Sequence, residues 1–266
     1  MKNRLHNYTA MNYLSIVLLV VLFAVLLGVA FARRRAVSLR ISNHARIIHL
    51  TYKSREAVPN HIWAQYDKYA PEFTIRFADD EACEKAVARF SDAALSRYKS
   101  LKHGAHRADL YRYCVLYEAG GLYFDIKTLL TRPVREMFSN DEDSFVTLSL
   151  IGHAEPGPKC VYQGILKFPP KSPIMLSAIN DAVAKPPANY LDYTRRMYEI
   201  VRRHVDRREL STGIYKVDSS GSLHVFKEYA TNDCTKRDRH RRCRIDVLNH
   251  DGDVMCTVRD PSYPWV

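Results

Sequence analysis

Four charged residues, arranged in two close pairs, have the types and spacing to form a polar site at the end of a strand. Asp109 and Arg112 are three apart in a stretch of helical periodicity, so they share one helix face. Asp125 and Lys127 follow Leu122–Phe124, three apolar residues typical of a buried strand. Carboxylates bind hydroxyls or metal ions, and Arg and Lys neutralise phosphate oxygens. Because ligands of open α/β sheets bind outside the carboxyl ends of strands, these four are the candidate catalytic residues.

A helix, a glycine turn and a strand are needed to position these side chains. Apolar residues recur at helical spacing and predict a helix over Arg107–Glu118 with one buried stripe. Gly120 and Gly121 then end this helix, since glycine readily takes the left-handed conformation of a helix C-cap. The stripe consists of Leu110, Tyr113, Cys114 and Tyr117.

The string from Ala108 to Asp125, A-D-x-x-R-Y-x-x-L-Y-x-x-G-G-x-Y-x-D, resembles the sugar-nucleotide-binding segment of the DXD-motif glycosyltransferases. Within that group it is similar to family 32, which includes fungal mannosyltransferases and capsular-polysaccharide synthesis enzymes. Weaker similarity in Arg46–Lys53, Tyr162–Gly164 and Arg259–Trp265 extends the resemblance to the C-terminus. A lone D-x-D is weak, whereas the whole string in a helix–glycine–strand context is specific.

The resemblance implies a retaining transfer of a sugar from a UDP- or GDP-sugar to a glycan or glycoconjugate acceptor, with a divalent cation, normally Mn²⁺. It implies that Asp125 contacts the nucleotide sugar and the metal, and that Asp109 and Arg112 contact ribose and sugar. We expect Tyr52 to stack on the base, the alternative being that this strand residue belongs to the core. The other residues assigned to nucleotide-sugar binding are His49, Thr51, Gly120, Gly121, Tyr123, Gln163 and Gly164.

Lys127 departs from the DXD pattern because it stands where the second Asp is expected. A protonated lysine cannot ligate Mn²⁺, and its charge repels a nearby cation. Either a metal binds through Asp125, the diphosphate and a later residue such as His250 or Asp251, or Lys127 itself neutralises the diphosphate. A third interpretation leaves Lys127 in solvent at the strand end.

The N-terminal region predicts a membrane anchor. Leu14–Ala32 is an uncharged run of 19 residues, about 28 Å as a helix and close to the thickness of a bilayer core. Arg33–Arg35 follow it, and positive-inside counting would place the next domain in the cytoplasm. The resemblance instead implies a luminal catalytic domain in the Golgi or secretory pathway, which we favour. The predicted segments are a tail (1–13), a signal-anchor (14–32), a short stem (33–43) and a glycosyltransferase domain (44–266).

Strand and helix patterns alternate after the stem and predict an α/β domain with a mostly parallel central sheet. The resemblance implies that this domain is GT-A-like. The early elements are strands at Ile47–Tyr52 and Phe73–Phe77 and helices at Pro59–Tyr69 and Asp79–Phe90. The later ones are strands at Ser144–Leu150, Val161–Phe168, Ile245–Leu248 and Val254–Val258, helices at Ile174–Val183 and Tyr190–His204, and a turn at Asn249–Gly252.

Charge and cysteines limit the partners and the compartment. The formal net charge of +11 favours acidic partners. The basic loop Lys236–Arg242 lacks the interleaved aromatics of single-stranded nucleic-acid sites, so we expect no nucleic-acid partner. The predicted helix Tyr190–His204 carries Arg195, Arg196, Arg202 and Arg203, and we expect these arginines to form a solvated face. Cys234 and Cys243 suit a disulfide, with Cys256 as a further candidate, and their spacing matches no usual zinc pattern.

Two other classes of function stay open. A catalytically inactive relative would bind nucleotide sugar or glycan without turnover, and Lys127 supports this alternative. A membrane-tethered adaptor would bind an acidic partner through its basic loops. The adaptor requires the loop arginines and not Asp125, whereas an enzyme requires the opposite.

Overall fold

The computed structural model describes Phe23 and residues 46–137, 143–150, 159–217, 221–230 and 243–260. These residues, apart from Phe23, belong to one unit that runs from His44 to Val266. The predicted anchor apart from Phe23, the stem, Cys234, the basic loop and the C-terminal 261–266 lie outside the described residues. Within the described part, no helix has both the length and the apolar character needed to cross a bilayer.

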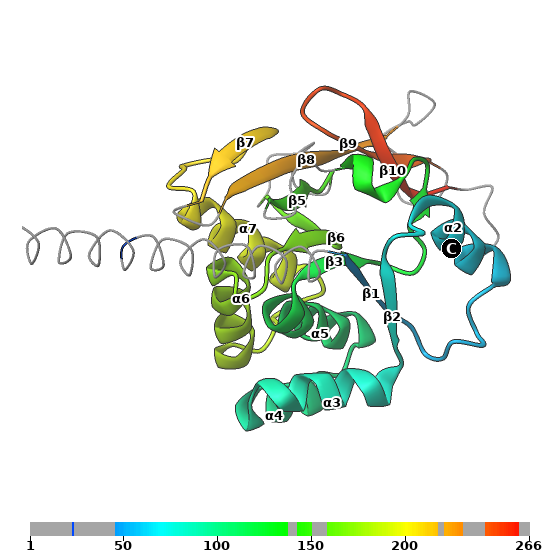
Figure 1. Cartoon of the computed structure of the whole chain (residues 1–266). Coiled ribbons are helices and arrows are strands. Elements are labelled where there is room, and N and C mark those ends of the chain that lie inside the picture. Colours follow the sequence, from blue (N-terminus) through cyan, green and yellow to red (C-terminus); the bar gives the residue numbers. More distant parts are fainter. Residues whose placement is uncertain are drawn as a thin grey trace, which may run out of the picture. The chain divides into compact units, whose positions relative to one another are not determined.

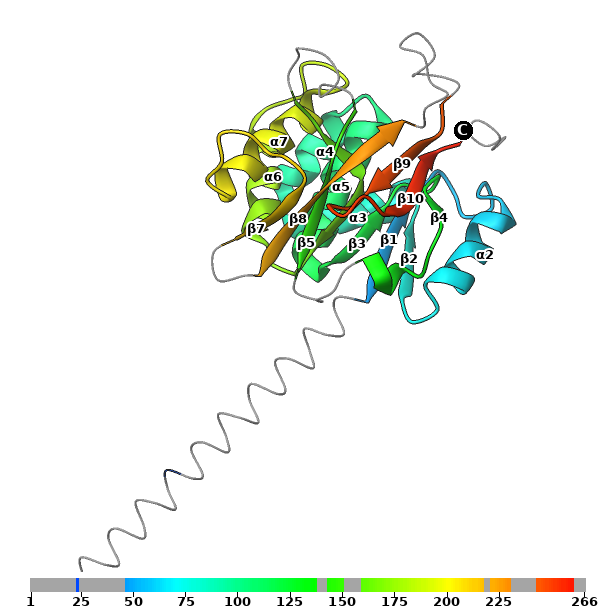
Figure 2. The same ribbon diagram turned by 90° about the horizontal axis from the view of Figure 1, so that it is seen from above.

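A curled mixed sheet, ten-stranded in the described residues, forms the centre of this unit (Figures 1 and 2). The strands are β1 (Ile47–Thr51), β2 (Thr74–Ala78), β3 (Gly121–Phe124), β4 (Leu129–Leu130), β5 (Ser144–Leu148), β6 (Val161–Phe168), β7 (Gly213–Lys216), β8 (Ser222–Ala230), β9 (Ile245–Leu248) and β10 (Val254–Arg259). Their order is β2-β1-β3-β6-β5-β8-β9-β10-β4, and β7 pairs with β8.

The prediction of a mostly parallel sheet is wrong. β1 pairs in parallel with β2 and β3, and β5 pairs in parallel with β8, but the other pairings are antiparallel. Helical connections join the strands of the parallel edge, as parallel pairing requires. Beyond β3 the neighbouring strands are β6 and β5, which run antiparallel to each other. The early strand–helix alternation therefore describes only one part of the sheet.

Helices cover the two faces of the sheet unequally. The helices are α2 (Asn60–Tyr69), α3 (Asp80–Phe90), α4 (Asp92–Ser100), α5 (Gly104–Ala119), α6 (Pro173–Ala184) and α7 (Asp192–His204), with a 3₁₀ helix at Val134–Met137. One core packs α3 to α7 against the sheet, and Figure 1 shows α3, α4, α5 and α6 together beneath the strands. The other core contains α2, the 3₁₀ helix and residues of β9 and β10. Strand ends between these two layers are therefore the places open to a ligand.

Local signals explain where several helices begin. The side chain of Asp79 accepts a hydrogen bond from the Ala82 amide at 2.8 Å, so α3 starts with the predicted acidic turn. The sequence analysis missed α4, which begins directly after Ser91. The Ser91 hydroxyl accepts from the Ala94 amide at 3.1 Å and caps this helix. A serine followed by an acidic residue was the available signal.

The glycine pair ends α5 and lets β3 approach β1 closely. Gly120 is the C-cap with φ 66°, as predicted, and Gly121 has φ 97°. A Cβ at Gly121 would lie 2.5 Å from the carbonyl oxygen of Ile47, which is too close for a side chain. The imidazole of His49 lies on the same turn, its Nε2 being 3.0 Å from the Gly120 carbonyl oxygen. This tight reversal places the first half of α5 beside the carboxyl end of β3.

Candidate functional site at the carboxyl end of β3

Arg112 brings the two predicted carboxylates together. Its Nη2 lies 3.3 Å from Asp109 Oδ1 and 3.5 Å from Asp125 Oδ1. Its Nη1 donates to the Gln163 carbonyl at 2.5 Å, and its guanidinium lies 4.3 Å from the centre of the Tyr123 ring. The side chains of Arg112 and Asp109 are 6% and 9% exposed, whereas that of Asp125 is 28% exposed. Asp125 is therefore the carboxylate of this trio that a ligand can reach.

Neighbouring backbone and hydroxyl groups fix the position of Asp125. Tyr123 Oη donates to Asp125 Oδ1 at 3.1 Å, and the Asp125 amide donates to the Gly164 carbonyl at 2.7 Å. The Thr128 amide donates to the Asp125 carbonyl at 2.8 Å and closes a four-residue turn. Lys127 lies within this turn with its side chain exposed. The lysine is thus at the mouth of the site, two residues from Asp125.

Gly164 leaves room for two oxygen atoms. The position of a Cβ on Gly164 would lie 2.2 Å from Tyr162 Oη and 2.7 Å from Asp125 Oδ2. No side chain fits there without displacing both groups. A glycine at this point in β6 therefore allows the tyrosine hydroxyl and the carboxylate to meet at the sheet edge. The sequence analysis included Gly164 by resemblance, and the structure supplies this steric reason.

Burial changes the acid–base properties of the trio. Burial raises the pKa of Asp109 to about 6, although the attraction of Arg112 acts in the opposite direction. Burial opposes the charge of Arg112, but Tyr123, Asp109 and Asp125 together raise the pKa of its guanidinium above the usual value. Arg112 thus stays charged across the physiological range, and Asp109 titrates just below neutrality.

We expect Asp109→Asn to remove a pH dependence of stability. The folded-state pKa of Asp109 is about 6 and its ordinary value is 3.8, so the native state holds this proton more tightly than the unfolded chain. Its stabilising contribution is complete below about pH 4 and is lost as the pH rises through 6. At about 1.4 kcal/mol per pKa unit, wild-type stability relative to Asp109→Asn should fall by about 3 kcal/mol over the whole titration and by about 2 kcal/mol between pH 4 and 7. Urea unfolding of both proteins measures this, and a difference that is flat or grows with pH contradicts it.

His49 and Thr51 make contacts inside the protein. His49 is 2% exposed, and burial lowers the pKa of its imidazole to about 4, so it is neutral. Thr51 Oγ1 donates to the Ala78 carbonyl at 2.8 Å and lies 3.1 Å from Cys83 Sγ. These side chains support the turn at Gly120 and the β1–β2 edge. Tyr52, one residue beyond β1, is partly exposed, and its stacking on a base stays a prediction.

Gln163 contributes more than the sequence suggested. Its carbonyl accepts from Arg112, and its side-chain Oε1 accepts from Tyr113 Oη at 2.7 Å. Gln163 thereby joins β6 to α5 behind the carboxylates. No sequence signal identifies this role, because the contact links residues 51 apart in the chain.

The described residues do not by themselves make a metal site. Among them, no group of three His, Cys, Asp or Glu side chains is arranged to hold an ion. His250 pairs with Asp251 at 3.3 Å in the turn between β9 and β10. Strand directions place that turn at the edge where β3 and β8 begin, opposite Asp125. These pairings give no support to a metal site that joins His250 or Asp251 to Asp125, and that interpretation stays a prediction.

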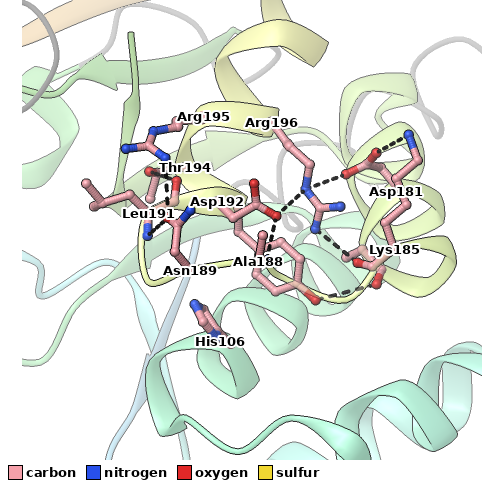
Figure 3. Close-up of polar contacts among 12 residues, drawn as sticks. His106, Asp181, Lys185, Ala188, Asn189, Leu191, Asp192, Thr194, Arg195 and Arg196 are labelled. Carbon is pink, nitrogen blue, oxygen red and sulfur yellow. Dashed lines mark hydrogen bonds and ion pairs between the residues drawn. The ribbon is translucent and has the colours of Figure 1, made fainter. Parts of the chain in front are cut away.

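A loop between α6 and α7 is held beside the start of α5. His106 Nε2 lies 3.2 Å from the Tyr190 carbonyl oxygen, and Tyr190 is 67% exposed. Figure 3 shows Arg196 reaching from α7 to Asp181 on α6 and to the carbonyl of Lys185. The Arg196 side chain is 17% exposed, so the predicted solvated arginine face is wrong for Arg196, whereas Arg203 is 70% exposed as predicted. Arg196 is fixed because it closes the junction of the two helices.

The cysteines follow the prediction in part. Cys114 is 1% exposed, which confirms that it is a buried apolar residue of α5. Cys243 is disulfide-bonded, while Cys256 and Cys83 are free thiols. Pairing of Cys256 is therefore not found. Cys234, the other predicted partner, lies outside the described residues.

Residues 60–145, about a third of the chain, match the family model of the glycosyltransferase sugar-binding region containing DXD motif. The resemblance to DXD-motif glycosyltransferases is confirmed. The matched segment contains Asp109, Arg112, Asp125 and Lys127. Its boundaries therefore enclose the charged residues of the site.

Two similar proteins carry related descriptions. An inositol phosphoceramide mannosyltransferase 3 of Schizosaccharomyces pombe is 31% identical over 83 residues, which are 30% of this chain and 23% of that protein. The chain thus spans about a quarter of the length of this curated relative. A solved structure, the PaToxG glycosyltransferase, is 13% identical with a TM-score of 0.45 over 66% of this chain and 80% of that one.

Proposed function

We propose that this protein transfers a sugar from a nucleotide-sugar donor to a hydroxyl group of a glycan or glycoconjugate acceptor. The observation that carries the proposal is the trio of Arg112, Asp109 and Asp125 within the matched DXD region. Its reachable carboxylate, Asp125, stands at a strand end where ligands of such sheets bind. The donor is a UDP- or GDP-sugar in this proposal.

The side chains suggest how the transfer is assisted. The bond from the anomeric carbon to the diphosphate oxygen breaks, and its electron pair goes to the diphosphate. The oxygen of the acceptor hydroxyl bonds to the carbon, and its proton passes to the departing diphosphate. Asp125 Oδ2 is available to accept hydrogen bonds from donor hydroxyls, because Tyr123 and Arg112 hold Oδ1. The exposed ammonium of Lys127 can neutralise the departing diphosphate, whose negative charge grows in the transition state. Enzymes of the DXD group generally use a divalent cation for this neutralisation.

Diphosphate release from a donor panel tests this proposal. We would incubate the full chain with UDP- and GDP-sugars, with Mn²⁺ or with a chelator, in the presence and absence of hexoside acceptors. We expect release with one nucleotide class, and if Lys127 neutralises the diphosphate, release survives chelation and falls at least 10-fold in Lys127→Ala. Release that requires Mn²⁺ and is unaffected in Lys127→Ala contradicts the role of the lysine. No release with any donor contradicts the enzyme itself.

A second candidate, a binder without turnover, rests on Lys127, which stands where the motif has its second Asp. It predicts measurable affinity for one nucleotide sugar without diphosphate release in the same panel. Retention of configuration, implied only by the family 32 resemblance, is checked by the NMR coupling constant of the product's anomeric proton.

We also propose that residues 14–32 anchor the chain in a Golgi or other secretory membrane, with the catalytic domain in the lumen. The uncharged apolar run supports the anchor, and the resemblance supports the orientation. Release of the protein from membranes by alkaline carbonate contradicts the anchor. Digestion of the domain by protease added to sealed vesicles contradicts the orientation.

A further inference from the structure

A cavity of about 430 Å³ opens at the carboxyl ends of β5 and β8, on the same sheet edge as Asp125. This volume lies in the range of about 300–1,000 Å³ that is usual for small-molecule sites. Its wall combines hydroxyl, charged and apolar side chains from three separate segments. They include Ser149, Leu150, Leu210, Thr212, Lys227 and Glu228.

Glu228 is the buried polar group of this cavity. It is 8% exposed, and its Oε2 accepts hydrogen bonds from Ser149 Oγ and from the Leu150 amide, both at 2.8 Å. The hydrogen bonds that the described residues make to this carboxylate all use Oε2. Oε1 is therefore the acceptor that Glu228 can offer to a ligand. A buried carboxylate held in this way is costly for folding alone, which is typical of a functional group.

The cavity lies at a suitable distance from the donor site. β3, which leads to Asp125, and β8, which carries Glu228, are separated by β6 and β5. Three strand spacings of about 4.8 Å separate β3 from β8 by about 14 Å across the sheet. Tyr162 of β6 lies between them, and after burial the charges of Asp125 and Glu228 both raise the pKa of its hydroxyl. A donor at Asp125 and a ligand in the cavity would thus lie on one sheet edge with Tyr162 between them.

The charges of the wall select the kind of ligand. Among the described residues, the wall holds two acidic side chains, Glu209 and Glu228, and one basic side chain, Lys227, while Glu209 is paired with Lys159 outside the wall. These acidic and basic groups balance, so the described wall offers a phosphate or carboxylate ligand no excess of positive charge. Hydroxyl groups beside Leu150 and Leu210 instead suit a ring with polar edges and apolar faces.

We propose that this cavity is the acceptor subsite and that it takes a neutral sugar or polyol ring, one hydroxyl of which donates to Glu228 Oε1. The inference rests on the proposed glycosyl transfer and names the acceptor class. It assigns donor and acceptor to separate parts of one sheet edge. Glu228 is a binding residue in this arrangement, so its loss affects acceptor affinity before donor affinity.

Ligand binding to the full chain tests the subsite without turnover. Saturation-transfer NMR would measure methyl glucoside, methyl galactoside, methyl mannoside and, for comparison, glucose 6-phosphate, while calorimetry measures UDP and GDP. Thr212→Phe fills the cavity, and Glu228→Gln replaces the acceptor oxygen with an amide. Ile214→Phe is the matched control, since Ile214 is 53% exposed and does not line the cavity.

We expect the wild type and Ile214→Phe to bind a neutral hexoside equally. Thr212→Phe and Glu228→Gln should each weaken that binding by about 10-fold or more, the usual effect of losing a charged hydrogen bond. Nucleotide affinity should be unchanged in all four proteins. The inference is overturned if no neutral hexoside binds, if binding survives in Thr212→Phe, if nucleotide binding is lost with it, or if glucose 6-phosphate binds more tightly. Failure of the proposed transfer would appear separately, as absent diphosphate release.

Discussion

Asp125→Asn is expected to lower diphosphate release by about 10²–10³-fold, the usual effect of removing one electrostatic contact from a transition state. The replacement keeps the shape of the side chain and an Oδ1 that can accept from Tyr123, but it removes the negative charge beside Arg112. Donor hydroxyls that bind a carboxylate then meet a neutral amide. Initial rates with the active donor, and calorimetry with the free nucleotide, measure the change.

Asp67→Asn is the matched control for this variant, because Asp67 is an exposed carboxylate on α2. It should release diphosphate at the wild-type rate. Equal rates in wild type and Asp125→Asn, with a folded protein, would remove Asp125 from the site. A variant that has lost its structure is recognised by its unfolding transition, so the two outcomes are separable.

Arg112→Met is expected to reduce the free energy of unfolding by about 3–5 kcal/mol at pH 7, the usual range when one partner of a buried ion pair is removed. It leaves Asp109 and Asp125 without their counter-charge and the Gln163 carbonyl without its donor. The loss should be smaller at pH 5, where Asp109 is largely protonated because its pKa is about 6. Urea unfolding at both pH values measures it.

Arg112→Lys and Arg89→Met provide the comparison. The lysine keeps the charge but cannot reach both carboxylates with a planar fork, so its loss should be intermediate. Arg89 pairs with Glu118 on the surface with 59% of its side chain exposed, and its loss should cost less than about 1 kcal/mol. An Asp109→Asn/Arg112→Met double variant more stable than Arg112→Met alone indicates that the uncompensated charge is the cause. Equal losses in Arg89→Met and Arg112→Met would contradict the central role of Arg112.

The parts of the site that the sequence predicted are those encoded by neighbouring residues. Helical spacing brought Asp109 and Arg112 to one face, and the glycine pair reversed the chain so that Asp125 returned beside them. The position of β6 between β3 and β5 depends on long-range pairing, which no local pattern encodes. The contact between Gln163 and Arg112 could not be predicted for the same reason.

Glu228 was missed although a signal was present. Along β8, Phe226 and Glu228 are two apart and therefore on one face, and Phe226 packs in a core. A glutamate on the buried face of a strand requires partners, and Ser149 and Leu150 supply them. For Arg196 of α7 the prediction was wrong in the reverse direction. Charge alone predicted solvent, but Arg196 has carboxylate and carbonyl partners on α6 and beyond its end.

The order of strands along the sheet has an evolutionary consequence. Asp109, Arg112 and Asp125 are contributed by the chain before residue 145, whereas the wall of the cavity is built by Leu148 and later residues. The hydrogen bond between Arg112 and Gln163 joins the two halves through a backbone carbonyl, which any residue supplies. Substitutions in the later half can therefore alter the cavity while the charged trio keeps its geometry. If the trio and the cavity serve the proposed donor and acceptor, an architecture of this kind allows one inherited donor site to be combined with many acceptors.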